Sequence, residues 1–559
     1  MVNDKSTGSY YTPSILSEFL TKHIFAKHLG TGPLKILEPS CGDGSFVSAL
    51  SNTRVLNNYK SVYIDLLEID KTELGKSATI AHNIPNLGIN ITATPGDYLD
   101  YTGSGYTLII GNPPYVNKKL LPSQQVEKCR NICRKSIPDF GEIKNIWPTF
   151  LLKSISELAD NGVLCYVLPG EILQVNYTRK IREFLLNKFE RIEIFSFNEL
   201  IFPGIEQDVI AFIGVKKVAN ETDKGVSFYQ VEKLTDLKIP GYVEKHSNVH
   251  RKNLNKWTNY ILSDNELNNI DTVVKKLNLK STKEYCDRIE VGIVTAANKF
   301  FIVEDNVVNE YKLKSLVKPL IQKGTQVQNS IRITRESFKK LKEKNKRVNF
   351  LHFKPKPENK QNKGIQKYIE KGVALKLHEQ YKMKLRNYWY CVPTVWVSEG
   401  MFIKRSHLYP RVLINEAEAY VTDSFYRIMM KDQYSIKNFT FSFYNTLTFV
   451  LAELEGRYYG GGVLELIPTE FKRLKIPYND KITNDQLNNL DKLFRDEKPL
   501  KEILEYSDSI LLPTLTKEER KKLSSILKKL VERRLKVQKK NPKITYHSLP
   551  ENSLSKLPA

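Results

Sequence analysis

The chain of 559 residues is longer than one hydrophobic core usually spans and is long enough for two or three domains. Its 41% content of hydrophobic residues excludes a largely disordered chain, and no apolar run approaches the roughly 20 residues of a membrane helix. Residues 1–13 lack the apolar core of a signal peptide, so we expect a cytoplasmic protein with no membrane partner.

The net charge of +24 is unevenly distributed. Residues 1–245 contain 27 basic and 27 acidic side chains, which leaves 59 basic and 35 acidic side chains for residues 246–559. A neutral first part and a basic second part suggest a domain that carries the chemistry, joined to one that binds a polyanion. A lysine-rich solubilising surface is the alternative interpretation of the same composition.

The cysteines are scattered and contain no C-x-x-C pair, which suits a reducing compartment. They are Cys41, Cys129, Cys133, Cys165, Cys286 and Cys391. Cys129 and Cys133 can share one face of a helix, but no second pair accompanies them. We therefore expect buried thiols and no metal site.

Between residues 34 and 217, short apolar runs alternate with amphipathic segments. Strands are predicted at residues 34–40, 61–70, 89–99, 106–115, 163–170, 191–197 and 209–217. Helices are predicted over 145–162, ending at Asn161-Gly162, and over 177–188. This alternation predicts an α/β fold, a Rossmann-like, doubly wound and mostly parallel seven-stranded sheet with helices on both faces.

Polar residues follow four of these strands, and in such a sheet ligands lie beyond the carboxyl ends of the strands. The polar strand exits are Glu38 to Gly44, Glu68, Asp97 and Asn112 to Tyr115. Gly42 and Gly44 allow a tight turn and a close approach to a ligand. The loop lacks both the third glycine of a dinucleotide fingerprint and the lysine of a P-loop.

The acidic residues at the carboxyl ends of these strands indicate a nucleoside cofactor. Glu68 has the position of a ribose-binding carboxylate, and Asp97 can accept from an adenine amino group. Each acid alone is more often a helix cap or a solvated strand end. Acids at three consecutive strand exits favour the cofactor.

The motifs follow one another in a recognisable order. They are GSYYTP (Gly8 to Pro13), LEPSCGDGSF (Leu37 to Phe46), LLEID (Leu66 to Asp70), GDYLD (Gly96 to Asp100), GNPPY (Gly111 to Tyr115) and FPGIEQDVIAFIG (Phe202 to Gly214). The set resembles the class I S-adenosylmethionine-dependent DNA methyltransferases, and within them the adenine-N6 group with Asn-Pro-Pro-Tyr and a Taq-like C-terminal target-recognition domain. The resemblance implies methyl transfer from S-adenosyl-L-methionine to a flipped adenine in a specific double-stranded DNA sequence.

The tetrapeptide at Asn112 to Tyr115 suits such chemistry. The lone pair of an exocyclic amino nitrogen is spread into the ring, and two acceptors on its hydrogens draw that pair out of conjugation. The Asn112 side-chain oxygen and the Pro113 carbonyl can be those acceptors, and Pro113 and Pro114 stiffen the turn. Tyr115 can stack on one face of the base, and Phe202 occupies the family's position for the other. The alternative is a plain turn with a packed tyrosine.

The resemblance also implies the cofactor contacts, and they fall into three groups. They are Tyr11, Thr12, Pro13, Glu38, Cys41 and Gly42 for the methionine part, Glu68 for the ribose hydroxyls, and Ile69 and Asp97 for the adenine. Many members have another small residue at the position of Cys41.

Three segments are expected, a methyltransferase domain at 1–245, a basic mixed α+β target-recognition domain at 246–480 and a basic helical segment at 481–559. A linker is predicted between Lys217 and Tyr285. Lysines interleave with aromatic residues over 335–364, which suits DNA contacts or a solvated surface. Residues 458–462 suit either an aromatic loop near DNA or a hairpin tip. Residues 517–543 predict an amphipathic helix whose apolar side chains are Leu523, Ile526, Leu527 and Leu530.

The sequence is also compatible with other functions. The main rival is an inactive methyltransferase-fold module that only binds DNA. Within enzymes, methylation of cytosine N4, RNA or a release-factor glutamine are alternatives, and the basic second part counts against the glutamine. We expect a monomer on double-stranded DNA in the bacterial cytoplasm, acting as the modification enzyme beside a separate restriction endonuclease.

Overall fold

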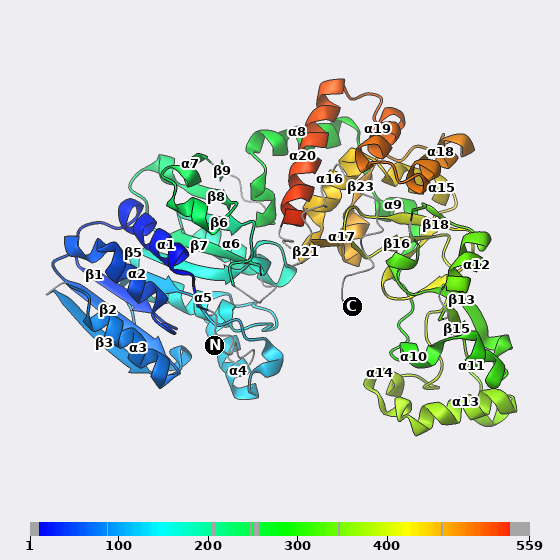
Figure 1. Cartoon of the computed structure of the whole chain (residues 1–559), viewed down its shortest axis with the longest axis horizontal. Coiled ribbons are helices and arrows are strands. Elements are labelled where there is room, and N and C mark those ends of the chain that lie inside the picture. Colours follow the sequence, from blue (N-terminus) through cyan, green and yellow to red (C-terminus); the bar gives the residue numbers. More distant parts are fainter. Residues whose placement is uncertain are drawn as a thin grey trace. The chain divides into compact units, whose positions relative to one another are not determined.

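The computed structural model describes residues 11–85, 88–202, 208–245, 247–250, 256–327, 329–344, 347–459 and 462–536. The chain divides into two compact units, with the division after Leu267 (Figure 1). Within the described ranges, no helix combines the length and the apolar character that crossing a membrane requires.

The first unit is built on one large sheet. Its strands are β1 (Leu34–Glu38), β2 (Val62–Glu68), β3 (Ile89–Pro95), β4 (Tyr106–Gly111), β5 (Leu158–Pro169), β6 (Arg191–Phe197), β7 (Val209–Val215), β8 (Gly225–Val231) and β9 (Ser247–His250). Their order is β3-β2-β1-β4-β5-β7-β6-β8-β9. β7 runs antiparallel to β5 and β6, β9 runs antiparallel to β8, and the other pairs are parallel.

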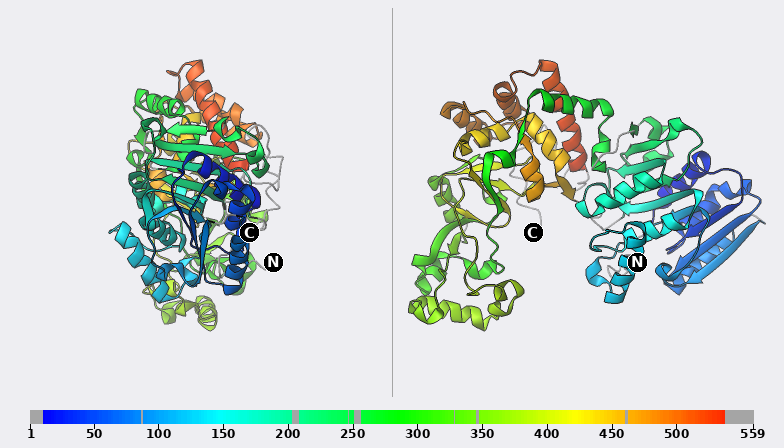
Figure 2. Two further views of the ribbon diagram at one scale, coloured as in Figure 1. Left: turned by 90° about the vertical axis from the view of Figure 1, so that its left-hand side faces the viewer. Right: turned by 180° about the vertical axis from the view of Figure 1, so that it is seen from behind.

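Helices cover both faces of this sheet (Figures 1 and 2). The helices of the first unit are α1 (Ser14–Lys27), α2 (Ser45–Thr53), α3 (Lys71–His82), α4 (Ser123–Ser136), α5 (Trp147–Glu157), α6 (Arg179–Lys188) and α7 (Tyr242–Lys245). Helix α8 (Asp264–Lys276) spans the division between the two units. His23 on α1 lies 2.6 Å from the Glu193 carboxylate on β6, a buried contact between helix and sheet. The predicted doubly wound, mostly parallel α/β fold is confirmed.

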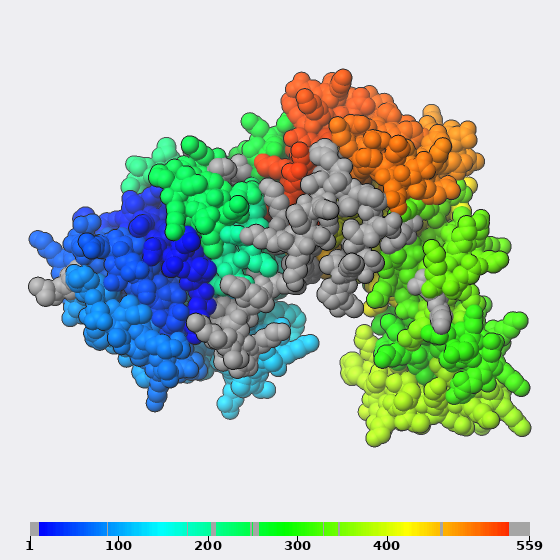
Figure 3. Space-filling model, in the orientation of Figure 1, coloured from blue at the N-terminus to red at the C-terminus, as the bar shows by residue number. Residues whose placement is uncertain are grey.

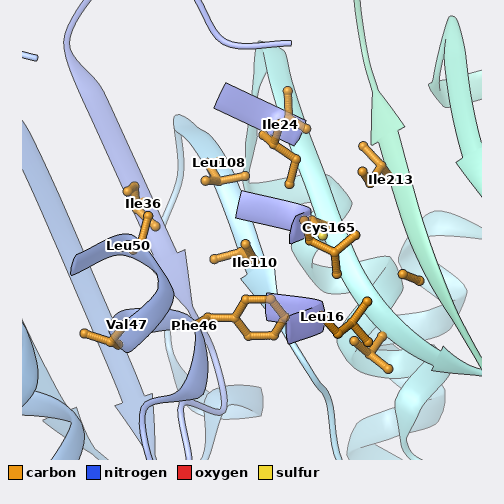
Figure 4. Packing of buried hydrophobic residues seen from close by; sticks show 14 of the residues in the cluster. Leu16, Ile24, Ile36, Phe46, Val47, Leu50, Leu108, Ile110, Cys165 and Ile213 are labelled. Atoms are coloured by element: carbon orange, nitrogen blue, oxygen red, sulfur yellow. The ribbon is translucent and has the colours of Figure 1, made fainter. Parts of the chain in front are cut away.

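The core of the first unit lies between α1, α2 and the central strands. Figure 4 shows side chains of α1 and α2 meeting those of β1, β4, β5 and β7. Leu108 and Ile110 of β4 face this cluster, and Ile109 between them is equally buried on the other face. A strand that is buried on both faces needs apolar residues at successive positions, so the apolar run at residues 108–110 predicts a central strand.

Two details of the sheet differ from the prediction. Its seven predicted strands are present, but β8 and β9 extend the sheet to nine strands among the described residues. Helix α5 ends at Glu157 rather than at Asn161, because Leu158 takes up an extended conformation and pairs with Tyr106 of β4. An added Cβ at Gly162 would lie 2.8 Å from the Tyr106 carbonyl oxygen, so this approach of the chain requires glycine.

The predicted linker between Lys217 and Tyr285 is wrong, because much of that stretch is folded. β8 pairs in parallel with β6 and buries Val226, Phe228 and Val231. The prediction rested on frequent Asn, Asp and Lys, but these polar residues lie around a buried strand. The division after Leu267 also lies beyond the expected boundary at residue 245.

The second unit is a mixed α+β structure. Its strands are β10 (Lys280–Ser281), β11 (Cys286–Val291), β12 (Ile302–Val303), β13 (Val317–Ile321), β14 (Arg332–Ile333), β15 (Asn349–Leu351), β16 (Gly400–Ile403), β17 (Arg405–Ser406), β18 (Val412–Asn415), β19 (Tyr420–Val421), β20 (Phe425–Met430), β21 (Arg457–Tyr459), β22 (Val463–Glu465) and β23 (Lys475–Ile476). The larger sheets have the orders β11-β20-β16-β18-β14 and β12-β15-β13-β19.

The helices of the second unit include one long C-terminal helix. They are α9 (Thr282–Tyr285), α10 (Asn298–Phe301), α11 (Asp305–Glu310), α12 (Arg335–Lys344), α13 (Lys363–Ala374), α14 (Tyr381–Lys384), α15 (Ile436–Phe443), α16 (Thr446–Glu455), α17 (Pro468–Arg473), α18 (Asn484–Arg495), α19 (Leu500–Leu511) and α20 (Lys517–Lys536). Leu523, Ile526, Leu527 and Leu530 are buried, which confirms the amphipathic helix as far as residue 536. Residues 537–543 of that prediction lie outside the described ranges.

Helix α20 is held by a buried ion pair. The Arg534 guanidinium contacts the Glu453 carboxylate of α16 at 2.7 Å, and both side chains are at most 4% exposed. The helices α18 to α20 thus belong to the same compact unit as the strands β10 to β23.

Candidate active site

The loops after β1 and β4 lie side by side at the carboxyl edge of the sheet. Leu37 of β1 pairs with Ile109 of β4, so Glu38 and Gly111 end neighbouring strands. An added Cβ at Gly111 would lie 3.8 Å from the Glu38 side chain. The Ser40 hydroxyl donates to the Asn112 carbonyl oxygen at 3.3 Å. The glycine loop and the Asn-Pro-Pro-Tyr turn are thus brought together, as strand order predicts.

The Asn112 amide is oriented by Tyr115. The Tyr115 hydroxyl lies 2.8 Å from Asn112 Oδ1 and 2.9 Å from the carbonyl oxygen of Val167 on β5. One hydroxyl hydrogen is therefore shared between two acceptors. The restricted φ of the two prolines fixes the middle of the turn. The contacts of the Tyr115 hydroxyl fix its end. The Tyr115 hydroxyl contact was not predicted from the sequence, which suggested only a stacking ring.

Phe202 lies in the apolar cluster of the first unit. Its side chain is 2% exposed and the neighbouring Ile201 is 3% exposed. Residues 203–207, which continue the motif that begins at Phe202, lie outside the described residues. Tyr115 packs against the same cluster, which extends over α1, α2 and the central strands of the first unit.

The glycine loop turns sharply into α2. Gly42 and Gly44 have φ of +51° and +83°, a region that favours glycine. An added Cβ at Gly42 would lie 3.3 Å from the Tyr11 ring, so this tyrosine covers the loop. The Ser77 hydroxyl of α3 donates to the Gly42 carbonyl at 2.8 Å. Burial and the nearby Glu73 and Asp43 carboxylates raise the pKa of Tyr11 to about 12, so its hydroxyl stays protonated.

Glu68 connects the ends of two strands. Its carboxylate accepts from the Gly42 amide at 3.0 Å and from the Ile69 and Asp70 amides at 2.8 and 3.1 Å. The Ile69 side chain is 72% exposed, which is unusual for a large apolar residue and suits contact with the ring of a ligand. Asp97 accepts from the Leu99 amide at 2.9 Å and so also caps a helical turn.

Glu38 is a buried acid with an unsatisfied oxygen. It is 2% exposed, and its Oε2 has no hydrogen-bond partner among the described residues. Burial raises its pKa well above the ordinary value, and the Asp43 and Glu68 carboxylates raise it further. The Thr12 hydroxyl is similarly buried and unpartnered within the described part of the chain. Glu38 lies at the start of the glycine loop, and Thr12 follows Tyr11, whose ring lies close to Gly42. Two such buried acceptors fit the ammonium end of an amino-acid ligand.

The sequence matches two families and several named proteins. Residues 50–202 match the family described as Eco57I restriction-modification methylase, and residues 254–512 match Type II methyltransferase M.Eco57I, C-terminal domain. The chain is 27% identical to the Type II methyltransferase M.AccI of Acinetobacter calcoaceticus, over 91% of this chain and 93% of that protein. It is 26% identical to M.BanIII of Aneurinibacillus aneurinilyticus, over 42% of this chain and 43% of that relative.

The chain belongs to the class I S-adenosylmethionine-dependent DNA methyltransferases. The methylase match lies in the first unit of the methyltransferase, and most of the match to the C-terminal domain lies in the second. A solved structure of the Type IIL restriction-modification enzyme MmeI in complex with DNA matches with a TM-score of 0.52, over 94% of this chain and 74% of that one. At 11% identity, this likeness shows the fold alone.

The structure of the methyltransferase adds residues that sequence reasoning missed. Ser77 and Val167 each contact a motif residue, but neither has a distinctive spacing from the motif. Ser40 lies within the motif of the glycine loop, but its contact with Asn112 was not predicted. Only Gly8 to Tyr10 of the first motif lie outside the described residues. Cys41 is 4% exposed, and burial together with the Glu38 carboxylate raises the pKa of its thiol. The neutral Cys41 thiol can therefore line the site but is a poor nucleophile.

Proposed function

We propose that the protein is a site-specific DNA adenine-N6 methyltransferase, the modification enzyme of a restriction–modification system. The observation that carries this proposal is the Asn112 amide, held by Tyr115 at the strand edge beside Glu38. The naming of its relatives as Type II methyltransferases supports double-stranded DNA as the substrate.

The residues at the strand edge fit S-adenosyl-L-methionine. The cofactor would supply a methyl group on a cationic sulfur. Glu38 and Thr12 offer buried acceptors to its ammonium group, and Glu68 offers carboxylate oxygens to its ribose hydroxyls. Ile69 would cover the adenine ring, and Asp97 would accept from its amino group. Tyr11, Pro13, Cys41 and Gly42 would line the methionine part.

The chain's own contribution to transfer is orientation. Asn112 Oδ1 and the Pro113 carbonyl accept from the two amino hydrogens of the target base, which directs the nitrogen lone pair out of the ring. The rigid Pro113-Pro114 turn prevents these acceptors from reorganising during the reaction. Stacking on Tyr115 and Phe202 would contribute about 1–3 kcal/mol per contact towards holding the base outside the duplex. The amino proton becomes acidic once the nitrogen is methylated, so no general base is required.

Mapping modified bases in cellular DNA tests the substrate and the atom together. DNA from cells that express the protein should show N6-methyladenine at one recurrent sequence by long-read sequencing. The Asn112→Ala variant should abolish the signal, whereas Asn90→Ala, at an exposed position on β3, should leave it intact. If N4-methylcytosine is found at the recurrent sequence instead, the target base is cytosine rather than adenine. Unmodified DNA, with both proteins expressed and folded, would favour an inactive DNA-binding module.

A further inference from the structure

Exposed apolar side chains gather in one part of the second unit. Tyr381 is 78% exposed, Leu385 is 71% exposed, Leu375 is 60% exposed and Val373 is 40% exposed. They belong to or follow α13 and α14, which lie at the opposite end of this unit from α18 and α19 (Figures 1 and 3). Large apolar side chains left in water so close together along the chain indicate a binding surface.

The outward direction of Tyr381 and Leu385 is set by packing. Met383 lies between them on α14, is fully buried and belongs to the apolar cluster of this part of the unit. Residues four apart share one face of a helical turn, and the residue between them points to the opposite face. The buried Met383 therefore holds the tyrosine and the leucine towards solvent.

Basic residues surround these apolar side chains. Residues 354–386, here called the α13–α14 segment, contain ten Lys and Arg but only three Asp and Glu. None of its nine lysines forms an ion pair with another described residue. By contrast, Lys340 on α12 and Lys522 on α20 each pair with a glutamate one turn away. Because these lysines have no acidic partner among the described residues of their own unit, we expect their binding partner to be a polyanion rather than a protein whose surface carries both charges.

We propose that the α13–α14 segment is a DNA-contacting element of the second unit. Lys382 and Lys384 neutralise backbone phosphates, while Tyr381 and Leu385 pack against base and sugar edges in a groove. Phosphate contacts position a protein on a duplex, and apolar side chains on a rigid turn enter a groove or wedge against a base step. This inference rests on the proposed function, whose substrate is double-stranded DNA.

Paired variants separate the two kinds of contact. Binding to a labelled duplex is measured over a series of salt concentrations, using the full-length protein. Lys382→Gln with Lys384→Gln should make the slope of log K against log salt shallower by up to about 1.8, since each phosphate contact contributes about 0.9. Tyr381→Ala with Leu385→Ala should weaken binding about 10-fold without changing the slope.

Matched controls lie in the first unit. Lys22→Gln with Lys60→Gln removes two exposed lysines, and Tyr63→Ala removes a side chain that is 47% exposed. Both should bind as wild type, and cofactor binding by every variant shows that the first unit is folded. Wild-type affinity and slope in both α13–α14 variants would overturn this inference and leave the surface to a protein partner. Failure of the wild-type protein to bind any duplex would instead refute the proposed function.

Discussion

At the scale of single residues, the site depends on the contact between Tyr115 and Asn112. A side-chain amide that turns freely would spend part of its time away from the target amino group. The Tyr115 hydroxyl, at 2.8 Å from Asn112 Oδ1 and 2.9 Å from the Val167 carbonyl, ties that amide to β5. In the proposed function, Tyr115 would thus combine a stacking ring with a positioning hydroxyl.

Tyr115→Phe separates these two roles, because it keeps the ring and removes the hydroxyl. One neutral hydrogen bond contributes about 1 kcal/mol, so we expect kcat to fall about 5-fold with little change in the KM for the cofactor. Tyr115→Ala should also weaken DNA binding, because the stacking surface is lost. Steady-state kinetics measures both effects. A kcat for Tyr115→Phe equal to that of the wild type would show that the hydroxyl has no positioning role.

Glu38 should couple cofactor binding to pH. Its pKa in the unliganded protein is raised by burial, so the protonated form is favoured. A bound ammonium group favours the carboxylate, so binding releases a proton and affinity rises with pH up to the raised pKa. Calorimetry in buffers of different ionisation enthalpy counts this proton. In Glu38→Gln the affinity should be lower and its pH dependence smaller.

The same substitution should stabilise the unliganded protein. An acid whose pKa is raised on folding costs stability as pH rises above its unfolded value, and a neutral amide escapes this cost. Thermal unfolding at pH 8 should therefore give a higher Tm for Glu38→Gln than for wild type. A lower Tm, or proton uptake when the cofactor binds wild type, would contradict this account of Glu38.

At the scale of elements, the junction between β1 and α2 depends on backbone conformation. Gly44 stands at the start of α2 with φ of +83°, and an added Cβ would lie 3.0 to 3.2 Å from Ser77 and Ile80 of α3. Gly75, by contrast, lies within α3, and apart from its chain neighbours and the backbone of its own helix no heavy atom of the described residues lies within 4 Å of the position that an added Cβ would take. The two glycines therefore form a matched pair for substitution by alanine.

Gly44→Ala should destabilise the first unit by about 1–2 kcal/mol, because a left-handed conformation disfavours a Cβ and α3 must move. Cofactor affinity should fall with it, since the loop includes Gly42. Gly75→Ala should increase stability by up to about 1 kcal/mol, because alanine is the better helix former. Denaturant unfolding measures whether each substitution raises or lowers the free energy of unfolding. Equal changes at the two positions would contradict the assigned role of the loop.

The elements also show what the sequence allows to be predicted. Apolar runs such as residues 108–110 identify central strands, and parallel topology then brings Glu38, Glu68 and Asn112 to one edge. The end of α5 and the strand β8 were missed because tertiary pairing decided them. Leu158 pairs with Tyr106, and β8 is buried against β6 despite polar flanking residues. The Tyr115 contact to Val167 depends on the distance between strands, which spacing along the chain does not encode.

At the scale of the whole molecule, charge and chemistry are divided along the chain. The net charge of +24 comes entirely from residues 246–559, and the strand edge with the proposed cofactor ligands belongs to the neutral part. DNA affinity should therefore fall steeply with salt, whereas cofactor affinity should change little. Parallel titrations over one salt series measure the two dependences. A cofactor affinity as salt-sensitive as the DNA affinity would contradict this division.

The most direct test of the proposed function is the identity of the methylated nucleoside. Unmodified duplex DNA is incubated with the protein and isotopically labelled S-adenosyl-L-methionine, digested to nucleosides and analysed by mass spectrometry. We predict labelled N6-methyldeoxyadenosine with the wild-type protein, and a rate at least about 100-fold lower with Asn112→Ala. Label on another nucleoside, or an unchanged rate with Asn112→Ala, would contradict the proposal.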